Sequence, residues 1–327
     1  MNPFSSAQWH GLYAQHIVRD QARKVCPPPL CGQERPWVLL QEGRRGTWRA
    51  AANYYTSLVG PADDDPRLQA DVQALLGWFD VRGESAEVAV LDLAPLALPV
   101  AQNLGTGLRQ RGWYVRHRAC FGNWYLLSDG RSFEDFMAQR PSQLQSTWRR
   151  KARRFQSGSR GAAIEIIVDP ERVAAGMDAF EAIYAKSWKR PEPYPAFIRA
   201  WAHACAEQGW LRLGVAWVDS VPVAAQIWFT VAGKAHIFKL AYDEAYAQLS
   251  PGTVLSGYLF RQALDVDRVH EIDYLSGDDV YKRSWMSHRR ERFRLLACDT
   301  RHPFGLARAA VERAREWRLM VKSAFGQ

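Results

Sequence analysis

Residues 235–285 read AHIFKLAYDEAYAQLSPGTVLSGYLFRQALDVDRVHEIDYLSGDDVYKRSW, and no other part of the chain says more about its architecture. Residues 235–242 have the composition of a strand. The tetrapeptide SPGT at 250–253 opens a helix that is expected to run to residue 268, since proline suits the first helical position. A strand at 271–275 and a short helix at 278–285 follow. The stretch therefore predicts strands and helices in alternation.

The neighbouring segments continue this alternation, because apolar residues recur with the period of two or of 3.6 that marks strands and helices. In chain order the second half reads as a strand at 164–168, helices at 172–189 and 195–207, strands at 210–218, 221–231 and 235–242, a helix at 251–268, a strand at 271–275, a helix at 278–285 and a strand at 292–297. The order is strand, two helices, three strands, helix, strand, helix, strand.

The first half also mixes strands and helices. Its expected elements are a helix at 6–24, a hairpin of strands 37–41 and 47–52, a helix at 67–80, a strand at 86–93, a helix at 97–111 and strands at 113–121 and 124–127. Such alternation is typical of α/β or mixed α+β domains. A chain of 327 residues most naturally holds two of them.

A long basic helix and a small linker separate the two halves. Residues 132–155 predict one helix, or two if Pro141 breaks it, with five basic residues between Arg149 and Arg154. The run SGSRG at 157–161 is the best linker in the chain. We therefore expect domains at 1–156 and 162–327. A terminal helix at 303–325 is amphipathic, and its stripe from Ala307 to Ala324 is expected to pack on a domain or a partner rather than on a membrane.

The composition indicates a soluble, cytoplasmic protein. Apolar residues make up 47% of the chain, which excludes disorder, and the net charge of +9 favours anionic ligands. The sequence has no signal peptide and no apolar run long enough to span a membrane. Its five cysteines are scattered, as in reduced cytosolic proteins, and Cys26 and Cys31 have no further zinc ligands nearby. No metal is expected.

Five stretches carry a family resemblance: NYYTSL (53–58), GNWYL (122–126), RPSQLQSTWRRKARRF (140–155), LSPGTVLSGYL (249–259) and EIDYLSGDDVYKRSW (271–285). In this order they resemble the GNAT acetyltransferases related to Fem-type peptidoglycan aminoacyltransferases and to cellulose-biosynthesis acetyltransferases, over about residues 36–298. The resemblance implies two GNAT-like domains in tandem, each a mixed sheet flanked by helices. The first would be degenerate and shape an acceptor cleft, and the second would bind acetyl-CoA or another acyl-CoA.

The start of the 251–268 helix is the expected donor site. A helix N-terminus offers N–H groups to a pyrophosphate, Gly252 allows close approach, and Thr253 adds a hydroxyl. The run from Gln248 resembles the GNAT phosphate loop, with Pro251 in place of its first glycine. The resemblance also implies that strands 238–242 and 272–275 splay apart around the pantetheine arm. The expected donor-binding residues are Gln248, Ser250, Gly252, Thr253, Lys239 and Tyr242.

Amine acylation needs a base for the attacking amine and an acid for the leaving thiolate. Tyr281 matches the position of the GNAT acid, and the base is expected to be Asp273 or Asp279, with Asp243 less favoured. The expected acceptor-side residues, which could equally be core or surface residues, are Tyr54, Tyr55, Asn123, Trp124, Tyr125, Trp228 and Lys282. Trp285 is a further candidate wall of the cleft.

Three functions are compatible with these features. The first is an acyl-CoA-dependent N-acyltransferase for a polar amine, such as an amino sugar or another precursor in surface-polysaccharide biosynthesis. The second is a Fem-like transferase that uses aminoacyl-tRNA, which the net charge and the Arg149–Arg154 segment suit, although the heptads of a coiled-coil arm are missing. The third is a non-catalytic binding protein, suggested by Pro251 in the phosphate loop.

Overall fold

The structure is a computed structural model that describes residues 1–18, 24–25, 36–42, 46–81, 87–157 and 161–325. The chain divides into two compact units, one made of Met1–Phe121 with Glu291–Gln327 and the other of Gly122–Arg290. These bounds differ from the expected 1–156 and 162–327. The difference arises because the basic helix before the linker packs on the helix that begins at Pro251, in the second unit, while the terminal helix packs in the first.

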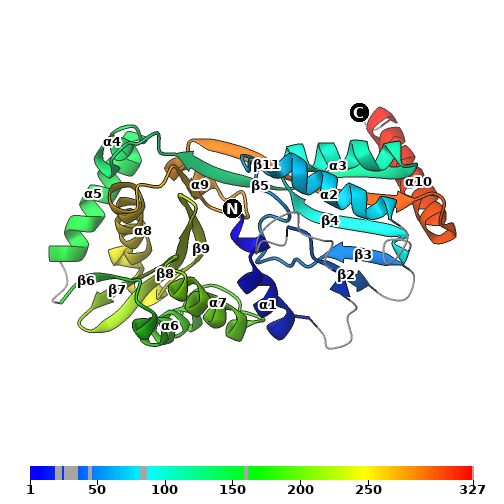
Figure 1. Cartoon of the computed structure of the whole chain (residues 1–327). Coiled ribbons are helices and arrows are strands. Elements are labelled where there is room, and N and C mark those ends of the chain that lie inside the picture. Colours follow the sequence, from blue (N-terminus) through cyan, green and yellow to red (C-terminus); the bar gives the residue numbers. More distant parts are fainter. Residues whose placement is uncertain (19–23, 26–35, 43–45, 82–86, 158–160, 326–327) are drawn as a thin grey trace. The chain divides into compact units, whose positions relative to one another are not determined.

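The first unit holds β1 to β4 and the parts of β11 and β5 within its bounds, in the order β1-β2-β3-β4-β11-β5. The strands are β1 (Lys24–Val25), β2 (Leu39–Glu42), β3 (Thr47–Ala50), β4 (Val90–Leu96), β11 (His288–Asp299) and β5 (Trp113–Leu127). The predicted hairpin is confirmed, since Leu39 pairs with Ala50 across β2 and β3. The helices are α1 (Ala7–His16), α2 (Leu68–Asp80), α3 (Leu98–Gln110) and α10 (Pro303–Phe325), and α2 lies beside α3 (Figure 1).

Helix α10 has the predicted bounds but packs through a different face. Its apolar residues Val311 and Trp317 are exposed. The buried face instead carries Glu312, whose carboxylate receives hydrogen bonds from Arg116 and Arg118 at 2.9 Å. The prediction that the apolar stripe packs on this chain is therefore wrong, because four arginines make the acidic face the better one to bury. Packing of the stripe on a partner stays a prediction.

The second unit has the order β5-β10-β9-β8-β7-β6. Strands β7 (Leu211–Val218), β8 (Val221–Val231) and β9 (Lys234–Tyr242) form an antiparallel meander. Strand β6 (Ala163–Ile167) pairs antiparallel with β7, and β10 (Glu271–Asp273) is parallel to β9. The sequence predicted these strands, with β10 two residues longer. The pair 113–121 and 124–127 forms one strand, β5. Both units are mixed α+β, as expected.

Helices cover both faces of this second sheet. Neighbouring strand residues point to opposite faces. A Cβ on Gly176 of α6 (Pro170–Ala185) would lie 2.6 Å from the Leu213 side chain, whereas one on Gly214 would lie 3.0 Å from that of Leu255 in α8 (Pro251–Arg261). Helix α6 therefore covers one face, together with α7 (Pro195–Glu207), and α8 covers the other, against α5 (Ser142–Ser157) (Figure 1).

Local signals explain several helix ends. The 132–155 segment forms two helices, α4 (Phe133–Ala138) and α5, so the alternative with a break at Pro141 is confirmed. Ser132 and Asp135 cap α4 reciprocally. Helix α8 ends at Arg261 and continues as one π-helical turn at Gln262–Val266. Helix α9 spans Val280–Trp285.

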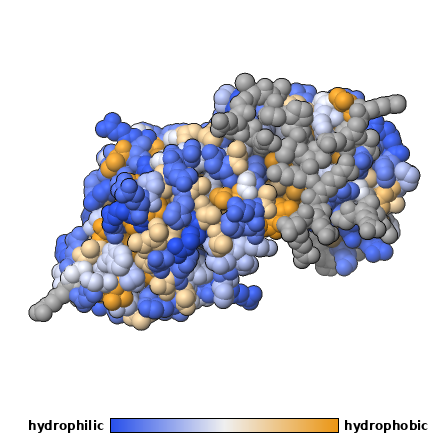
Figure 2. Space-filling view, turned by 60° about the horizontal axis from the view of Figure 1, so that its bottom comes forward, coloured by the Kyte–Doolittle hydropathy of each residue, from blue (hydrophilic) through white to orange (hydrophobic). Residues whose placement is uncertain are grey.

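The described surface and interior add three observations. Figure 2 shows a mostly hydrophilic face on which hydrophobic residues form small groups. None of the described helices is long and apolar enough to cross a lipid bilayer. Within the described ranges no three His, Cys, Asp or Glu side chains could hold a metal ion, and Cys120, Cys205 and Cys298 are free thiols. Cys26 and Cys31 lie outside the described residues.

Candidate functional site

Strands β9 and β10 are paired over only three residues of each. The pairs run from Glu271 with Lys234 to Asp273 with His236. Strand β9 then continues to Tyr242, whereas β10 ends at Asp273. The two strands therefore separate beyond His236, as the resemblance implied, and β10 leaves the backbone on that side of β9 open.

The chain leaves β9 because it continues along β5 instead. The Tyr274 N–H donates to the Trp124 carbonyl at 2.9 Å, and the side-chain amide of Asn123 donates to the Leu275 carbonyl at 2.7 Å. Leu275 itself has a φ of +56°, which a branched side chain rarely adopts. Hydrogen bonds on both sides of this residue hold the departure from β9 in place.

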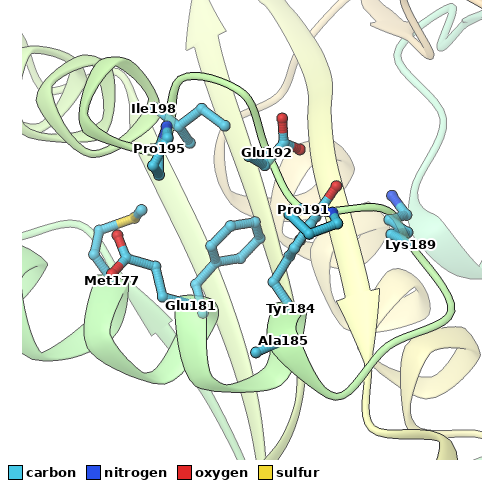
Figure 3. A pocket seen from close by; sticks show the side chains of 10 residues that line it. Met177, Glu181, Tyr184, Ala185, Lys189, Pro191, Glu192, Pro195 and Ile198 are labelled. Carbon is cyan, nitrogen blue, oxygen red and sulfur yellow. The ribbon is translucent and has the colours of Figure 1, made fainter.

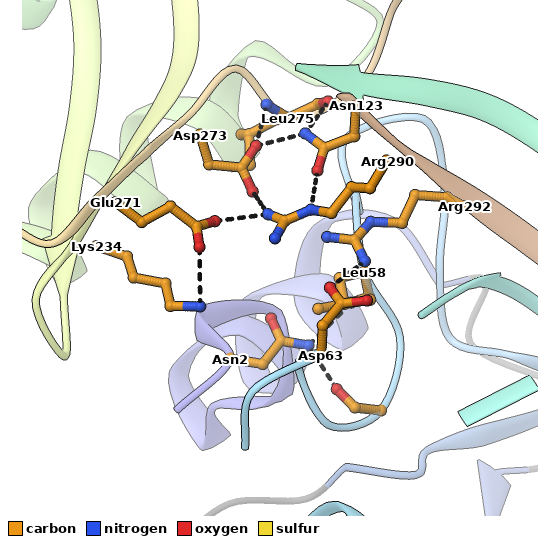
Figure 4. A network of polar contacts seen from close by, with 11 residues as sticks. Asn2, Leu58, Asp63, Asn123, Lys234, Glu271, Asp273, Leu275, Arg290 and Arg292 are labelled. Carbon is orange, nitrogen blue, oxygen red and sulfur yellow. Dashed lines mark hydrogen bonds and ion pairs between the residues drawn. The ribbon is translucent and has the colours of Figure 1, made fainter. Parts of the chain in front are cut away.

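A buried polar network supports this departure (Figure 4). Asp273 accepts hydrogen bonds from the Asn123 side chain at 2.5 Å, the Leu275 N–H at 2.6 Å and Arg290 at 2.7 Å. Arg290 also reaches Glu271 at 2.6 Å, and Glu271 pairs with Lys234 at 3.4 Å. Every charge in this network faces an opposite charge, which is the condition for burying charges at tolerable cost.

A cavity of about 360 Å³ opens where the strands separate. Strand β9 contributes Leu240, Ala241 and Tyr242, and the start of α8 contributes Gly252, Thr253 and Ser256. The segment after β10 contributes Tyr274, Asp279, Tyr281 and Trp285. Its volume lies in the range of small-molecule sites. The cavity thus joins the open side of β9 to a helix N-terminus.

The start of α8 offers few free amide hydrogens. Ser250 has left-handed backbone angles, and its carbonyl accepts the N–H groups of Thr253 and Val254 at 3.1 Å each. Pro251 has no N–H. Only the Gly252 N–H of this turn has no hydrogen-bond partner among the residues that the structure describes. A phosphate group here would meet this N–H, the Thr253 hydroxyl and the helix dipole.

The Gly252 carbonyl is held from behind. It accepts hydrogen bonds from the Gln226 side chain at 3.0 Å and from the Ser256 hydroxyl at 2.9 Å. A Cβ at Gly252 would lie 3.3 Å from the ring of Tyr242, so the absence of a side chain keeps the cavity open at this point. Gln226, on the sheet, and Ser256, one turn later in α8, therefore hold the first turn of α8 in place.

Tyr281 and Asp279 lie together in the wall of this cavity. The Tyr281 ring meets the buried Tyr274 ring edge-on, with centroids 5.8 Å apart. Although 47% of Tyr281 is exposed, partial desolvation in the cavity wall, with the nearby Asp279 charge, raises its pKa to about 12. Burial likewise raises the pKa of Tyr274 well above its usual value. Both hydroxyls are therefore protonated at neutral pH and can donate hydrogen bonds.

Of the predicted donor and catalytic residues, the structure brings Gly252, Thr253, Tyr242, Tyr281 and Asp279 to one cavity. The others lie elsewhere: Asp273 in the buried network, Gln248 on the surface, Ser250 in the turn, and Lys239 in an ion pair with Glu192 at 2.6 Å. Asp243, the less favoured base, caps the turn at 244–249 through the Ala245 N–H.

The predicted acceptor-side residues do not line this cavity. Trp228 is in the core, Asn123 is in the buried network, and Trp124 donates to Asp278 at 2.6 Å. Arg290 lies 4.2 Å above the ring of Tyr125. The buried Lys282 ammonium donates to the Ser276 carbonyl at 2.7 Å. In the first unit the Tyr54 ring is exposed and the neighbouring Tyr55 ring is buried.

Sequence reasoning missed several residues of the cavity. Trp188 and Lys189 come from the segment between α6 and α7, and Gln226 from a strand that reads as core. The Trp188 ring lies 4.7 Å from that of Tyr242. Gln226 carries the one available signal, because a glutamine within the apolar strand at 221–231 needs a buried hydrogen-bond partner.

The comparisons with known proteins agree with this geometry. Residues 142–283 match the model of the acetyltransferase (GNAT) domain. The whole fold is similar to that of FemX, with a TM-score of 0.59, 9% identity, and 90% of this chain and 92% of that one covered. It is also similar to L-PGS from Bacillus licheniformis, with a TM-score of 0.55, 9% identity, and coverage of 95% and 92%.

A third similar structure is the C-terminal domain of a putative lysylphosphatidylglycerol synthetase from Agrobacterium fabrum, with a TM-score of 0.52, 12% identity and 83% of each chain covered. No curated protein matches the sequence. At these identities the likeness shows the fold alone, whereas the match to the family model covers the meander, α8 and the segment that carries Tyr281. Residues 142–283 are therefore an acetyltransferase domain of the GNAT family, the domain of N-acyltransferases.

Proposed function

We propose that this protein is an acyl-CoA-dependent N-acyltransferase, most simply an acetyltransferase, that modifies a polar amine such as an amino sugar or a surface-polysaccharide precursor. The observation that carries the proposal is the separation of β9 from β10 beside the start of α8, with a cavity of about 360 Å³ between them. A bound CoA would place its pyrophosphate at Gly252 and Thr253 and its pantetheine amides along the open side of β9.

The reaction assigns one role to Asp279 and one to Tyr281, both in the cavity wall. Asp279 takes a proton from the acceptor ammonium, either directly or through a water. The freed amine attacks the thioester carbonyl, an N–C bond forms, and the C–S bond breaks. The leaving thiolate takes a proton from the Tyr281 hydroxyl, which is protonated at neutral pH, and the new amide nitrogen returns its second proton to the Tyr281 oxygen. Asp279 suits the base role better than Asp273, since Asp273 is held by Arg290 outside the cavity.

Two measurements test this function. Titration calorimetry should show CoA binding to the wild type, and Gly252→Val, which places a branched side chain against Tyr242, should weaken that binding at least tenfold. Thiol release from acetyl-CoA should then be stimulated by one class in a panel of amino sugars, nucleotide-linked amino sugars and small diamines. If millimolar CoA gives no heat and no amine stimulates thiol release, the proposal fails.

A second candidate is transfer from aminoacyl-tRNA, and helix α5 is the observation that favours it. Arg149, Arg150, Arg153 and Arg154 are exposed on consecutive turns of α5, which packs against α8. Such a row can neutralise successive phosphates of a nucleic acid. A gel-shift titration with total tRNA at several salt concentrations would support this candidate if affinity falls steeply with salt while CoA does not bind.

A further inference from the structure

A second cavity, of about 370 Å³, lies between α6, α7 and the segment that joins them (Figure 3). Helix α6 contributes Met177, Phe180, Tyr184 and Ala185, and the start of α7 contributes Pro195 and Ile198. These side chains are apolar or aromatic. Its walls thus suit a hydrocarbon group, and its volume is that of a ligand site.

The acidic residues of this cavity are already neutralised. Glu181 receives two hydrogen bonds from Arg199, at 2.8 and 3.0 Å. Glu192 receives one from the Lys239 ammonium at 2.6 Å. Because both carboxylates are paired with cations, neither is well placed to hold the ammonium group of an amine.

Lys189 is the remaining charged residue of this cavity, and it also lines the first cavity. Among the described residues it forms no ion pair, and its ammonium lies 5.6 and 5.8 Å from the ring centres of Trp188 and Tyr184. Figure 3 shows it at one edge of the lining residues. A cation at this junction repels an amine and attracts a carbonyl or carboxylate oxygen.

We propose that this second cavity holds the acyl chain of the donor, a saturated chain of medium length, with the thioester carbonyl near Lys189 where the two cavities meet. The inference rests on the proposed function, since it assigns the chain of the same acyl-CoA. It makes the preferred donor a medium-chain acyl-CoA rather than acetyl-CoA. Burial and the nearby Lys239 lower the pKa of Lys189 to about 8, so its hydrogen-bond donors persist in both protonation states.

Calorimetric titration of the full chain with CoA, acetyl-CoA and octanoyl-CoA tests the inference. Each methylene that enters an apolar site tightens binding by up to about fourfold. We therefore expect octanoyl-CoA to bind at least tenfold more tightly than acetyl-CoA. Ala185→Phe, which fills the cavity from its rim, should abolish this difference while leaving the affinity for CoA itself within twofold.

Ala182→Phe is the matched control. Ala182 is exposed on the same helix, one turn before Ala185, and does not line the cavity. Both variants make the same change in helix propensity and surface hydrophobicity. Only Ala185→Phe should remove the preference for octanoyl-CoA, and an equal loss in both variants would overturn the proposal.

Two results separate this inference from the proposed function. If CoA binds and acetyl-CoA and octanoyl-CoA bind equally, the chain assignment is wrong and the function stands. Free octanoate is the second probe: millimolar binding to the wild type that Ala185→Phe removes supports the chain site even if CoA does not bind. If Ala185→Phe instead raises only the KM of the amine, the cavity belongs to the acceptor and the proposal is overturned.

Discussion

Tyr281 is the residue whose environment best fits a catalytic step. Its ring lies in the wall of the cavity where β9 and β10 separate, and its hydroxyl is protonated at neutral pH. Tyr281→Phe should lower kcat about 100-fold, the smaller end of what general acids contribute, with CoA affinity nearly unchanged. Steady-state kinetics measure the first effect and calorimetry the second.

Tyr258→Phe is the control for that substitution. The Tyr258 hydroxyl accepts a hydrogen bond from Gln156 at 2.6 Å, and the ring does not line the donor cavity. Removal of this hydroxyl should leave kcat within twofold. Equal rates for the Tyr281→Phe variant and the wild type would show that the thiolate leaves without help from this side chain.

Lys189 makes stability depend on pH in an alkaline window. Its pKa of about 8 in the fold lies below the 10.5 of an exposed lysine, so folding costs free energy while the group is charged. This cost is fully present below pH 8 and disappears as pH rises through 10.5. Lys189→Met should therefore raise the free energy of unfolding by about 1 kcal/mol at pH 7, allowing for partial solvent screening.

Urea denaturation of Lys189→Met and of the wild type at pH 7, 8.5 and 9.5 measures this effect. The gap between the two proteins should shrink as the pH rises, because the unfolded wild type binds more protons than the folded one in this range. Lys186→Met is a suitable control, since Lys186 is exposed and pairs with Asp243 at 3.7 Å. A gap that widens with pH would mean that the fold stabilises the charged form of Lys189.

Asp273 has the contacts of a positioning residue. It holds the Leu275 N–H, Asn123 and Arg290 at the point where β10 leaves β9. Asp273→Asn should lower the free energy of unfolding by about 2 kcal/mol, because Arg290 loses one of its charged partners. The exposed Asp278 pairs with Arg289, and Asp278→Asn should cost less than about 1 kcal/mol.

Guanidinium denaturation measures the free energy of unfolding of both variants. A pH profile of kcat distinguishes a positioning role of Asp273 from a catalytic one. If Asp273 only positions the chain, the folded variant keeps the acidic limb of the profile. Loss of that limb with unchanged stability would make Asp273 the base after all.

At the scale of single elements, the packing of α5 on α8 depends on one glycine. A Cβ at Gly257 would lie 1.8 Å from the indole nitrogen of Trp148. Gly257→Ala should therefore push α5 away and destabilise the protein by about 1–3 kcal/mol, the usual cost of overpacking. Gly77 lies in the interior of α2, and a methyl group at this position would have nothing within 4 Å, so Gly77→Ala should stabilise the protein by about 0.5–1 kcal/mol.

Thermal unfolding measures the change in stability of both variants. Both replace a helical glycine by alanine, so helix propensity improves equally in both, and the opposite signs isolate the contact with Trp148. A stabilised Gly257→Ala variant would mean that the indole ring has room to move and that α5 is not fixed by this contact.

Elements were predicted well where periodicity decides them. The three-strand meander, α8 and the break at Pro141 follow from local patterns and caps. The end of β10 could not be predicted, because residues 274 and 275 are apolar like the strand before them. Hydrogen bonds from β5, far away in the sequence, decide that Tyr274 turns away from β9.

The site was predicted only in part for the same reason. The sequence indicates Gly252, Thr253 and Tyr281 because a helix start and a strand–helix junction are local features. Lys189 reaches the cavity where β9 and β10 separate through the segment between α6 and α7, on the far side of the sheet from α8. That approach depends on how the helices pack, which no local pattern encodes.

At the scale of the whole molecule, positive charge suits both candidate functions, because acyl-CoA and aminoacyl-tRNA are both anionic. The chain carries a formal net charge of +9, and α5, which carries the exposed arginines, packs on α8, the helix proposed to bind the donor. Positive potential near a site raises the rate at which a polyanion arrives, and salt screens this effect within about 10 Å at 0.1 M. For an acyl-CoA donor, kcat/KM should therefore fall several-fold as KCl rises from about 20 to about 300 mM, the range of concentration over which screening becomes strong. The value of kcat should change little.

Local charge and net charge can be separated with two triple variants. Arg149→Gln, Arg150→Gln and Arg153→Gln on α5 remove three charges in the unit that holds the donor site. Arg313→Gln, Arg318→Gln and Lys322→Gln on α10 remove three in the other unit, so the net charge is the same. Because α5 packs directly on α8, the α5 variant should lose most of the salt dependence of kcat/KM, and the α10 variant is the control of equal net charge. Equal slopes for both would assign the attraction to the overall charge, and α5 would then have no particular part in bringing the donor to α8.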